Sequence, residues 1–204
     1  GFLAGVPSVF IRIVGCPLRC KFCDTYYAAK SESGKKMTIT QIVKHVKKYP
    51  AKHIVITGGE PMICPNLAQV CNALKKYHIT IETAGINSIS GLKCDLMSIS
   101  PKLSNAYLKS SDKNLYLKID ELKKLIDNYN YQLKFVIDKT NDIKELNKVL
   151  SQLKNVDRTK VMLMSQAKNL SEYIRKGRLT AELCKKYNFV FSPRLHIMLW
   201  GNKR

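Results

Sequence analysis

The chain has 204 residues, of which 45% are hydrophobic and 25% charged, with 10 glycines and 7 prolines. These proportions are typical of an ordered globular protein and exclude a disordered chain or a disulfide-stapled mini-protein, because this length buries a sizeable core. No stretch approaches the roughly 18 uninterrupted apolar residues of a membrane span, and the first residues lack a basic-then-apolar signal pattern. We therefore expect a soluble protein with one large domain or two small ones.

The charge balance is strongly basic, with 35 Lys and Arg against 15 Asp and Glu and a net charge of +20. Such a charge favours anionic partners: nucleic acid, an acidic protein or an anionic small substrate. Many lysines, however, occur in pairs on predicted helices, and no compact Arg-rich block interleaved with aromatic residues is present. This pattern favours solvated helix faces over direct nucleic-acid binding.

Short β-rich runs alternate with longer runs of helical period along most of the chain. The β-rich runs predict strands near Ser8–Val14, His53–Thr57, Ile79–Thr83, Leu96–Ser100, Tyr131–Ile137, Val161–Met164 and Phe189–Ser192. The helical runs predict helices over Thr38–Tyr49, Asn66–Tyr77, Ile119–Tyr129, Asp142–Leu153 and Ser171–Tyr187. Thr38 and Gln41 form a potential capping box for the first of these helices. The alternation predicts an α/β fold with a mainly parallel sheet, in a full or partial barrel.

The unusual motifs of the sequence all follow predicted strands. They are Cys16–Thr25, Gly58–Pro61, Ala84-Gly85, Ser100–Lys102 and Ser165-Gln166. In parallel α/β folds, ligand-binding residues collect at the carboxyl ends of the strands. We therefore expect these motifs to share one rim of the barrel.

Three of the seven cysteines, Cys16, Cys20 and Cys23, lie within eight residues. Structural zinc needs four ligands, and no second pair of Cys or His at similar spacing is present. Three thiolates suit a four-iron cluster in which one iron has no protein ligand and can bind another molecule. The odd number of cysteines indicates a reducing, cytoplasmic compartment. The other four are expected to pack as small apolar side chains: Cys64, Cys71, Cys94 and Cys184.

The three-two spacing of these cysteines, with Phe22 before the last, resembles the signature of radical S-adenosylmethionine (radical SAM) enzymes. Thr57–Pro61, about 35 residues further on, resembles the second motif of that superfamily. The resemblance implies a cluster whose open iron chelates the amino and carboxylate groups of SAM and then reduces the sulfonium, releasing a 5′-deoxyadenosyl radical. It also implies that the acid of the second motif helps to bind the amine of SAM.

Further motifs make the whole chain similar to the 7-carboxy-7-deazaguanine synthases. These motifs are Gly5–Arg12, Cys23–Thr25, Glu82–Gly85, Ser100–Lys102 and Leu195–Gly201. The resemblance implies a single radical SAM core domain over residues 1–204 with a partial (β/α) barrel. It implies a carbon–nitrogen lyase of queuosine biosynthesis that converts 6-carboxy-5,6,7,8-tetrahydropterin to 7-carboxy-7-deazaguanine with loss of ammonia. The implied cofactors are a 4Fe-4S cluster, SAM, which is regenerated, and Mg²⁺.

The resemblance also assigns site residues by position. Cys16, Cys20 and Cys23 match the cluster ligands, and Thr25 matches the hydroxyl that coordinates Mg²⁺. The positions that match SAM-binding residues are Phe22, Asp24, Gly59, Glu60, Ser100, Pro101, Lys102 and Gln166. Arg12 and Thr57 match substrate-contacting positions, and a guanidinium suits the substrate carboxylate. Each assignment has an alternative. Arg12 could form an ordinary ion pair, Thr25 could cap a turn, and Lys102 could be a solvent-exposed side chain. Asp24 could bind the Mg²⁺ in place of Thr25.

The sequence departs from the family pattern in two places. It begins at Gly1–Leu3, where the family has an earlier strand that ends in a Gln-Gly-Glu turn, so we expect the N-terminal strand to be incomplete. Met164–Ala167 differs from the usual Met-Pro form and weakens the assignment of Gln166. We expect His196 and Trp200 to anchor the C-terminal strand rather than bind a ligand.

Two other functions fit part of the pattern. An activase that abstracts hydrogen from a glycine of a partner protein would share the cysteine spacing, but it would need a docking groove instead of the small-anion residues. A basic iron–sulfur or zinc module that binds RNA would show a steep salt dependence and no SAM cleavage. As partners of the synthase we expect the pterin substrate, a flavodoxin-type reductant and a second copy of the chain, with neither membrane nor direct nucleic-acid binding.

Overall fold

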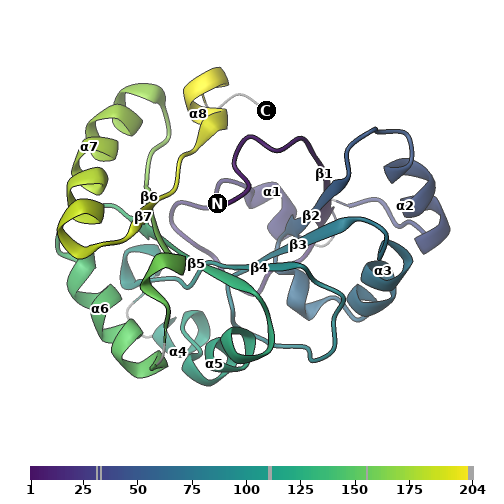
Figure 1. Cartoon of the computed structure of the whole chain (residues 1–204), viewed down its shortest axis with the longest axis horizontal. Helices are drawn as coiled ribbons and strands as arrows, with labels where there is room; N and C mark the ends of the chain where they lie inside the picture. Colours follow the sequence, from purple (N-terminus) through teal and green to yellow (C-terminus); the bar gives the residue numbers. More distant parts are fainter. Residues whose placement is uncertain (31, 33, 110–111, 155, 202–204) are drawn as a thin grey trace.

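A seven-stranded, all-parallel sheet forms the centre of the computed structural model, which describes residues 1–30, 32, 34–109, 112–154 and 156–201. The strands lie in sequence order: β1 (Ser8–Ile13), β2 (His53–Gly58), β3 (His78–Thr83), β4 (Leu96–Ile99), β5 (Tyr131–Ile137), β6 (Val161–Ser165) and β7 (Val190–Phe191). The sheet curves without closing, since β1 and β7 do not pair (Figure 1). The predicted α/β fold of the partial-barrel type is confirmed.

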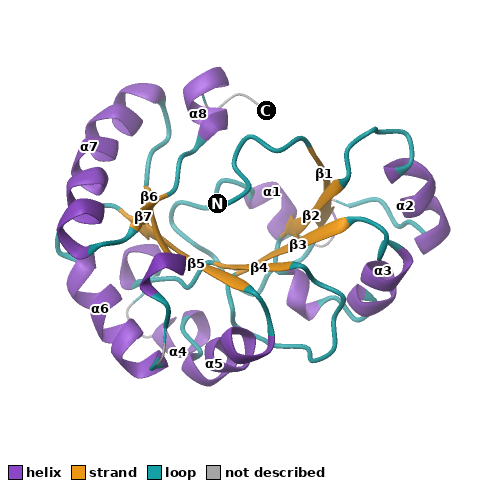
Figure 2. Ribbon diagram, viewed as in Figure 1, coloured by secondary structure: helices purple, strands orange, loops and turns teal. Residues whose placement is uncertain are grey.

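Most of the helices lie around the convex side of this sheet, whereas α1 (Tyr26–Ala29) and α8 (Leu195–Trp200) lie on its concave side (Figure 2). The others are α2 (Ile39–Val46), α3 (Leu67–Ala73), α4 (Lys113–Tyr116), α5 (Ile119–Asn128), α6 (Asp142–Leu153) and α7 (Leu170–Tyr187). Short 3₁₀ turns are η2 (Pro61–Ile63), η3 (Ser104–Ala106) and η5 (Arg158–Lys160). Of the described helices, none is long and apolar enough to cross a membrane.

The five predicted helices form at the predicted places, each with slightly different ends. The capping box of α2 is present: the backbone N–H of Gln41 donates to Thr38 Oγ1 at 3.2 Å, and Thr38 N–H donates to Gln41 Oε1 at 2.8 Å. Such a box satisfies two of the N–H groups that a helix start leaves without partners. At the other end of the chain, Asn188 ends α7 in the left-handed conformation (φ 55°).

The two faces of the sheet differ in polarity, because side chains alternate along a strand. Ile54 and Ile56 of β2, like Leu133 and Phe135 of β5, are buried in the main core between sheet and helices. The alternate positions, including Thr57, line cavities on the concave side. The barrel interior therefore presents polar and charged side chains among apolar ones, in contrast to the apolar core on the other face of the sheet.

The C-terminal segment differs from its prediction. The last strand is only Val190–Phe191, and a helix, α8, follows it. The prediction that Trp200 anchors the C-terminal strand is wrong, because Trp200 lies on α8 and is 64% exposed; His196 also lies on α8 but is partly buried.

Candidate active site

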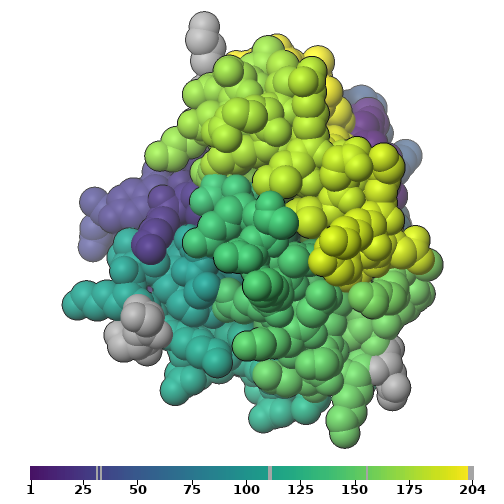
Figure 3. Space-filling view, turned by 90° about the vertical axis from the view of Figure 1, so that its left-hand side faces the viewer, coloured from purple at the N-terminus to yellow at the C-terminus, as the bar shows by residue number. Residues whose placement is uncertain are grey.

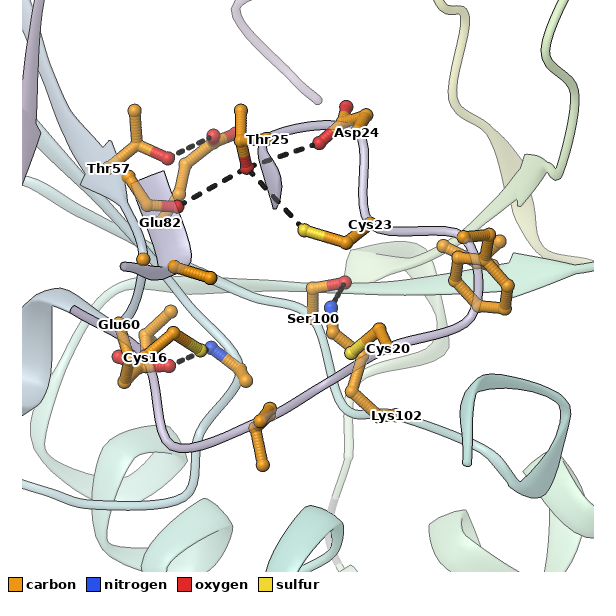
Figure 4. Close-up of a pocket in the computed structure, with 18 of the residues that line it drawn as sticks. Cys16, Cys20, Cys23, Asp24, Thr25, Thr57, Glu60, Glu82, Ser100 and Lys102 are labelled. Atoms are coloured by element: carbon orange, nitrogen blue, oxygen red, sulfur yellow. Dashed lines mark hydrogen bonds between the residues drawn. The ribbon is translucent and has the colours of Figure 1, made fainter. Parts of the chain in front are cut away.

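A cavity of about 200 Å³ opens at the carboxyl ends of the strands (Figure 4). Its walls contain the cysteine loop, the turn after β2, Ala84 after β3 and the segment after β4, which belong to four of the motifs expected on one rim. A second cavity of about 520 Å³ adjoins it along the concave face of the sheet. The residues that line both cavities include Asp24, Thr25, Thr57, Glu82, Lys134 and Arg194. The site thus has two adjoining compartments.

The cysteine loop is held on both sides by the backbone. Gly15 and Cys16 donate N–H groups to the carbonyls of Ala28 and Ala29, at 2.8 and 3.2 Å. On the other side, Lys21 N–H donates to the carbonyl of Ala106 at 3.0 Å. Arg19 N–H donates to the Tyr116 hydroxyl at 2.9 Å, and Leu18 is buried against Tyr107 and Tyr116. The loop that carries the three thiols is therefore positioned before any ligand binds.

The three thiols fit a four-iron cluster better than a single ion. Among the described residues, no group of three or more His, Cys, Asp or Glu side chains converges on one point as the ligands of a single metal ion do. In a four-iron cluster each thiolate binds a different iron, so the sulfurs stay apart. Burial raises the pKa of Cys16 and raises that of Cys20 to about 11. Binding of the cluster would therefore release protons from these thiols.

The Gly58-Gly59 turn after β2 lies directly against the cysteine loop. Gly58 has φ +130°, a conformation that only glycine adopts readily, and a Cβ on Gly59 would stand 2.0 Å from the carbonyl oxygen of Gly15. Gly59 N–H donates to the carbonyl of Ile13 at 2.7 Å, and Glu60 N–H donates to that of Gly15 at 2.9 Å. Both glycines are required for this close approach of two backbones.

Glu60 follows this turn and is 1% exposed. Its carboxylate accepts hydrogen bonds from Thr83 Oγ1 at 2.6 Å, from Ala84 N–H at 2.7 Å and from Met62 N–H at 3.1 Å. Burial raises the pKa of Glu60, and the three donors partly offset this effect. A cationic group of a ligand next to Glu60 would stabilise the charged form.

Thr25 places its hydroxyl among oxygen atoms at the junction of the two cavities (Figure 4). Thr25 Oγ1 lies 3.4 Å from Asp24 Oδ1, 3.4 Å from the carbonyl oxygen of Gly58 and 3.9 Å from Cys23 Sγ. Although Thr25 precedes α1, its side chain makes no capping hydrogen bond to that helix. The turn-cap alternative is therefore not supported, whereas Thr25 and Asp24 both place oxygen atoms at this junction.

A half-buried charge network crosses the floor of the site. Glu82 Oε2 accepts a hydrogen bond from Thr57 Oγ1 at 3.1 Å, and Glu82 Oε1 accepts one from Lys134 Nζ, also at 3.1 Å. The Lys134 ammonium holds the pKa of the Glu82 carboxyl below its ordinary value. Lys134 was not among the predicted site residues. Its signal was a lysine in the middle of the mostly apolar strand β5, on the same side as the other polar residue, Gln132.

The expected SAM-binding residues after β4 and β6 are only partly brought together. Ser100 and Lys102 line the first cavity, as does Phe22, and Lys102 Nζ donates to Ser100 Oγ at 3.0 Å. Pro101 is buried beside them and does not line the cavity. Gln166 also lies outside that lining, and its Oε1 accepts a hydrogen bond from Lys176 Nζ at 2.6 Å.

Two arginines face the second cavity. Arg12, the expected carboxylate ligand, lines it with its guanidinium 6.0 Å from the ring centre of Tyr27. Arg194, which the sequence analysis missed, is 9% exposed, lines both cavities and donates to the carbonyl of Ala167 at 2.8 Å. Arg194 Nη2 lies 3.4 Å from Asp24 Oδ2 and so connects the C-terminal segment to the cysteine loop.

Comparisons with known proteins agree with this arrangement. The family model of the radical SAM superfamily matches residues 10–163. A 7-carboxy-7-deazaguanine synthase from Rhodopirellula baltica is 34% identical over 215 residues, covering 100% of this chain and 83% of the relative. A synthase of the same name from Halobacterium salinarum is 32% identical and covers 99% of this chain and 86% of the relative.

Among solved structures, QueE from Escherichia coli has the same fold. It aligns with a TM-score of 0.69 at 23% sequence identity, covering 94% of this chain and 86% of that one. Since the superfamily uses a four-iron cluster and SAM, the cysteine loop and its cavity have the chemistry that the superfamily requires. The chain therefore belongs to the radical SAM superfamily and, within it, to the 7-carboxy-7-deazaguanine synthase family.

Proposed function

We propose that the chain is a carbon–nitrogen lyase of queuosine biosynthesis that converts 6-carboxy-5,6,7,8-tetrahydropterin to 7-carboxy-7-deazaguanine with release of ammonia. One observation carries the proposal. The cysteine loop, the Gly-Gly-Glu turn and a second compartment with charged side chains share one site, in a chain similar over its whole length to synthases of that name. Bound there, the cluster and SAM would supply the radical that starts the rearrangement.

The first compartment is proposed to hold the cluster and SAM. Cys16, Cys20 and Cys23 are the cluster ligands in this proposal. The SAM-binding residues that line this compartment would be Phe22, Asp24, Gly59, Glu60, Ser100 and Lys102. Pro101 and Gln166, which lie outside its lining, would support the same site from behind. Glu60 offers a carboxylate to the amine of SAM, whereas the Lys102 ammonium suits its carboxylate. Because Gly58 and Gly59 have no side chains, SAM could approach the backbone of this turn closely.

The second compartment is proposed to hold the pterin. Its floor offers the carboxylate of Glu82 and the ammonium group of Lys134. Arg12 lines the same cavity. A guanidinium binds a carboxylate with two parallel hydrogen bonds, so Arg12 would bind the 6-carboxylate and the Thr57 hydroxyl would hold the ring. These contacts would orient the ring toward the first compartment.

Mg²⁺ would bind where the two compartments meet. The atoms there are oxygens: the Thr25 hydroxyl, the carbonyl of Gly58 and the carboxylate of Asp24. Mg²⁺ prefers oxygen ligands and keeps several waters, so this donor set fits the ion when substrate oxygens complete it. The ion would stabilise negative charge on the substrate.

The remaining features of the proposal concern partners and location. As a cytoplasmic enzyme, the chain would form a homodimer, take electrons from a flavodoxin-type protein and bind no nucleic acid directly. The basic charge of +20 supports an acidic reductant, because opposite charges accelerate association.

The test is anaerobic incubation of the reconstituted protein with dithionite, SAM, Mg²⁺ and the carboxylated pterin, followed by mass analysis. We expect 7-carboxy-7-deazaguanine and ammonia in equal amounts, with SAM not consumed. Cys20→Ala should lose iron and product, whereas Cys71→Ala, a matched change of a thiol buried in the main core, should retain four irons per chain. SAM cleavage without pterin conversion would instead favour the glycyl-radical activase. A cluster that never cleaves SAM would favour the RNA-binding module.

A further inference from the structure

The segment before β1 crosses the concave side of the sheet from β5 to β1 (purple in Figure 1). We call this segment, residues 1–6, the N-terminal loop. Two turns fold it: Ala4 N–H donates to the carbonyl of Gly1 at 3.0 Å, and Val6 N–H donates to that of Leu3 at 3.1 Å. Five of its six residues line the second cavity. Because three strands lie between β5 and β1, the loop spans this cavity and forms one of its walls.

Gln132 of β5 holds the far end of the loop. Its Oε1 accepts a hydrogen bond from Phe2 N–H at 2.7 Å, and its Nε2 donates to Ser98 Oγ of β4, also at 2.7 Å. Gln132 is only 3% exposed, so its carbonyl oxygen would lose free energy if Phe2 withdrew its donor. A Cβ on Gly1 would stand 2.5 Å from Gln132 Nε2, which shows that the chain passes directly against this amide.

The near end of the loop is held by β1 and β2. Ser8 Oγ donates to the carbonyl of Val6 at 2.8 Å and lies 2.7 Å from His53 Nδ1. Because Ser8 has one hydroxyl proton, which it gives to Val6, His53 Nδ1 is the donor in the second contact. The loop is thus attached to the sheet at both of its ends.

Gln132 also lies in the same row of the sheet as residues of the proposed pterin compartment. It is paired with Ser98, and Ser98 is paired with Glu82, which accepts a hydrogen bond from Thr57 Oγ1. Gln132 lines the second cavity, whereas the other face of β5 and β6 packs against α6 and α7. The side chains of these helices form the green and yellow-green surface in Figure 3. The amide of Gln132 therefore acts on the interior of the barrel.

We propose that Gln132 is a positioning residue for substrate binding: it holds the N-terminal loop as the wall that encloses the pterin in the second compartment. Gln132 needs no contact with the substrate for this role. Its amide fixes the loop, and the fixed loop limits the space in which the ring can move. Without this anchor the wall would open to water. The part of this inference that concerns the pterin rests on the proposed function, whereas the anchoring of the loop does not.

The test removes the N–H of Phe2, which is 44% exposed, and leaves the core unchanged. Phe2 is the second residue of the turn over residues 1–4, a position that proline favours, so Phe2→Pro keeps the turn but deprives Gln132 Oε1 of its donor. We expect the KM for the pterin to rise by about ten-fold, with a much smaller change in kcat. SAM binding should be unchanged.

Amide hydrogen exchange tests the anchor without any turnover. Exchange of residues 3–6 in Phe2→Pro should accelerate by about ten-fold, because the loop opens more often when its anchor is lost. Phe2→Ala removes the same side chain but keeps the N–H, so it is the matched control. Phe2→Ala should resemble the wild type in both the KM for the pterin and the exchange of the loop.

Two substitutions of Gln132 test the other partner of this hydrogen bond. Gln132→Leu should reproduce both changes of Phe2→Pro. Gln132→Glu should behave like the wild type, because an ionised carboxylate accepts from Phe2 N–H and the Ser98 hydroxyl, and a protonated one donates to Ser98. Gln152→Leu, the same change at an exposed position of α6, is the control.

Two results would overturn the proposal. Exchange of the loop in Phe2→Pro at the wild-type rate would mean that the loop is held without Gln132. Faster exchange with an unchanged KM would mean that the loop does not enclose the substrate. If the wild type does not convert the pterin, the proposed function fails, and hydrogen exchange still decides whether Gln132 anchors the loop.

Discussion

The hydroxyl of Thr25 is the residue-scale feature most open to a decisive test. It lies 3.4 Å from oxygen atoms of both Asp24 and Gly58 and does not cap α1. Thr25→Val keeps the shape of the side chain but removes the oxygen. We expect normal cluster content and SAM binding but a loss of Mg²⁺-stimulated turnover of about ten-fold or more. Thr25→Ser should keep part of the response. The measurement is product formation against Mg²⁺ concentration.

Asp24→Asn is the matched comparison for this experiment, since Asp24 is the neighbouring oxygen ligand. Loss of the Mg²⁺ response in Asp24→Asn alone, with Thr25→Val like the wild type, would assign the ligand role to Asp24. Because Asp24 also lies 3.4 Å from Arg194 Nη2, its replacement should in addition loosen the C-terminal segment. Thr25→Val has no such effect, so the two variants should differ in thermal stability.

His53 gives a residue-scale prediction on pH. Its ring is buried between Ser8 Oγ at 2.7 Å and Thr80 Oγ1 at 2.8 Å. Burial, and then the nearby ring of His78, lower the pKa of His53 below its ordinary value of 6.5. The unfolded chain therefore binds a proton more readily than the folded chain, and His53 contributes stability that is complete above pH 6.5 and is lost as pH falls.

The expected result is a smaller loss of stability between pH 7.5 and pH 5 in His53→Gln than in the wild type. Glutamine retains a donor and an acceptor for the two hydroxyls but does not titrate. Urea unfolding at both pH values measures the difference. His45→Gln, which changes an exposed histidine of α2, is the control. Equal pH dependence in the wild type and His53→Gln would contradict the argument.

At the scale of elements, the turn between β2 and η2 determines how the cysteine loop is held. A Cβ on Gly59 would stand 2.0 Å from the carbonyl oxygen of Gly15, which is backbone and cannot rotate away. Gly59→Ala should therefore displace the loop, lower iron incorporation and lower stability by about 1–3 kcal/mol. Gly177→Ala in α7 is the control, since among the described residues outside the helix backbone the nearest atom to an added Cβ is Ser165 Oγ at 3.9 Å. It should be neutral or stabilising by up to about 1 kcal/mol, because alanine favours helix.

Iron content after reconstitution and the midpoint of urea unfolding measure both variants. Normal iron content in Gly59→Ala would show that the loop adapts, and the turn would then have no special role. The comparison with Gly177→Ala separates this specific collision from a general intolerance of added methyl groups.

The seven strands and five longer helices could be predicted because the regular spacing of hydrophobic residues is a local property of the sequence. The capping box of Thr38 and Gln41 is local in the same way, and it is present. The short elements α1, α4 and α8 were not predicted, because a segment of four to six residues has too few turns to show a period. The final helix, with its exposed Trp200, carries a run of apolar residues that also fits a strand.

The site was predictable to the extent that its residues lie in contiguous motifs. Cys16, Glu60 and Lys102 could be placed on one rim because each follows a strand. Lys134 and Arg194 could not, because their partners Glu82 and Asp24 are distant in sequence and only the curvature of the sheet brings them together. A single sequence does not show which residues form such long-range ion pairs, although the lysine in the middle of β5 does mark an unusual position.

At the scale of the whole molecule, the net charge of +20 is both a feature for recognition and a cost in stability. Like charges repel more strongly in the compact state than in the unfolded chain. Attractive pairs such as Lys185–Glu182 are exposed and each contribute only about 0–1 kcal/mol, so they do not balance this repulsion. Because salt at 0.1–0.2 M screens charges beyond roughly 10 Å, it should stabilise the fold.

We expect raising NaCl from 0.01 to 0.2 M at pH 7 to increase the free energy of unfolding by on the order of 1 kcal/mol, which raises the Tm by roughly 2–4 °C for a chain of this size. The increase should be larger at pH 4.5, where some of the 15 Asp and Glu side chains become protonated and the net charge rises. Circular dichroism melts at both pH values measure it, and sulfate at equal ionic strength distinguishes screening from binding of a particular anion. A Tm that falls with salt at both pH values would mean that attractive ion pairs dominate. Repulsion between the basic side chains would then not lower the stability of the fold.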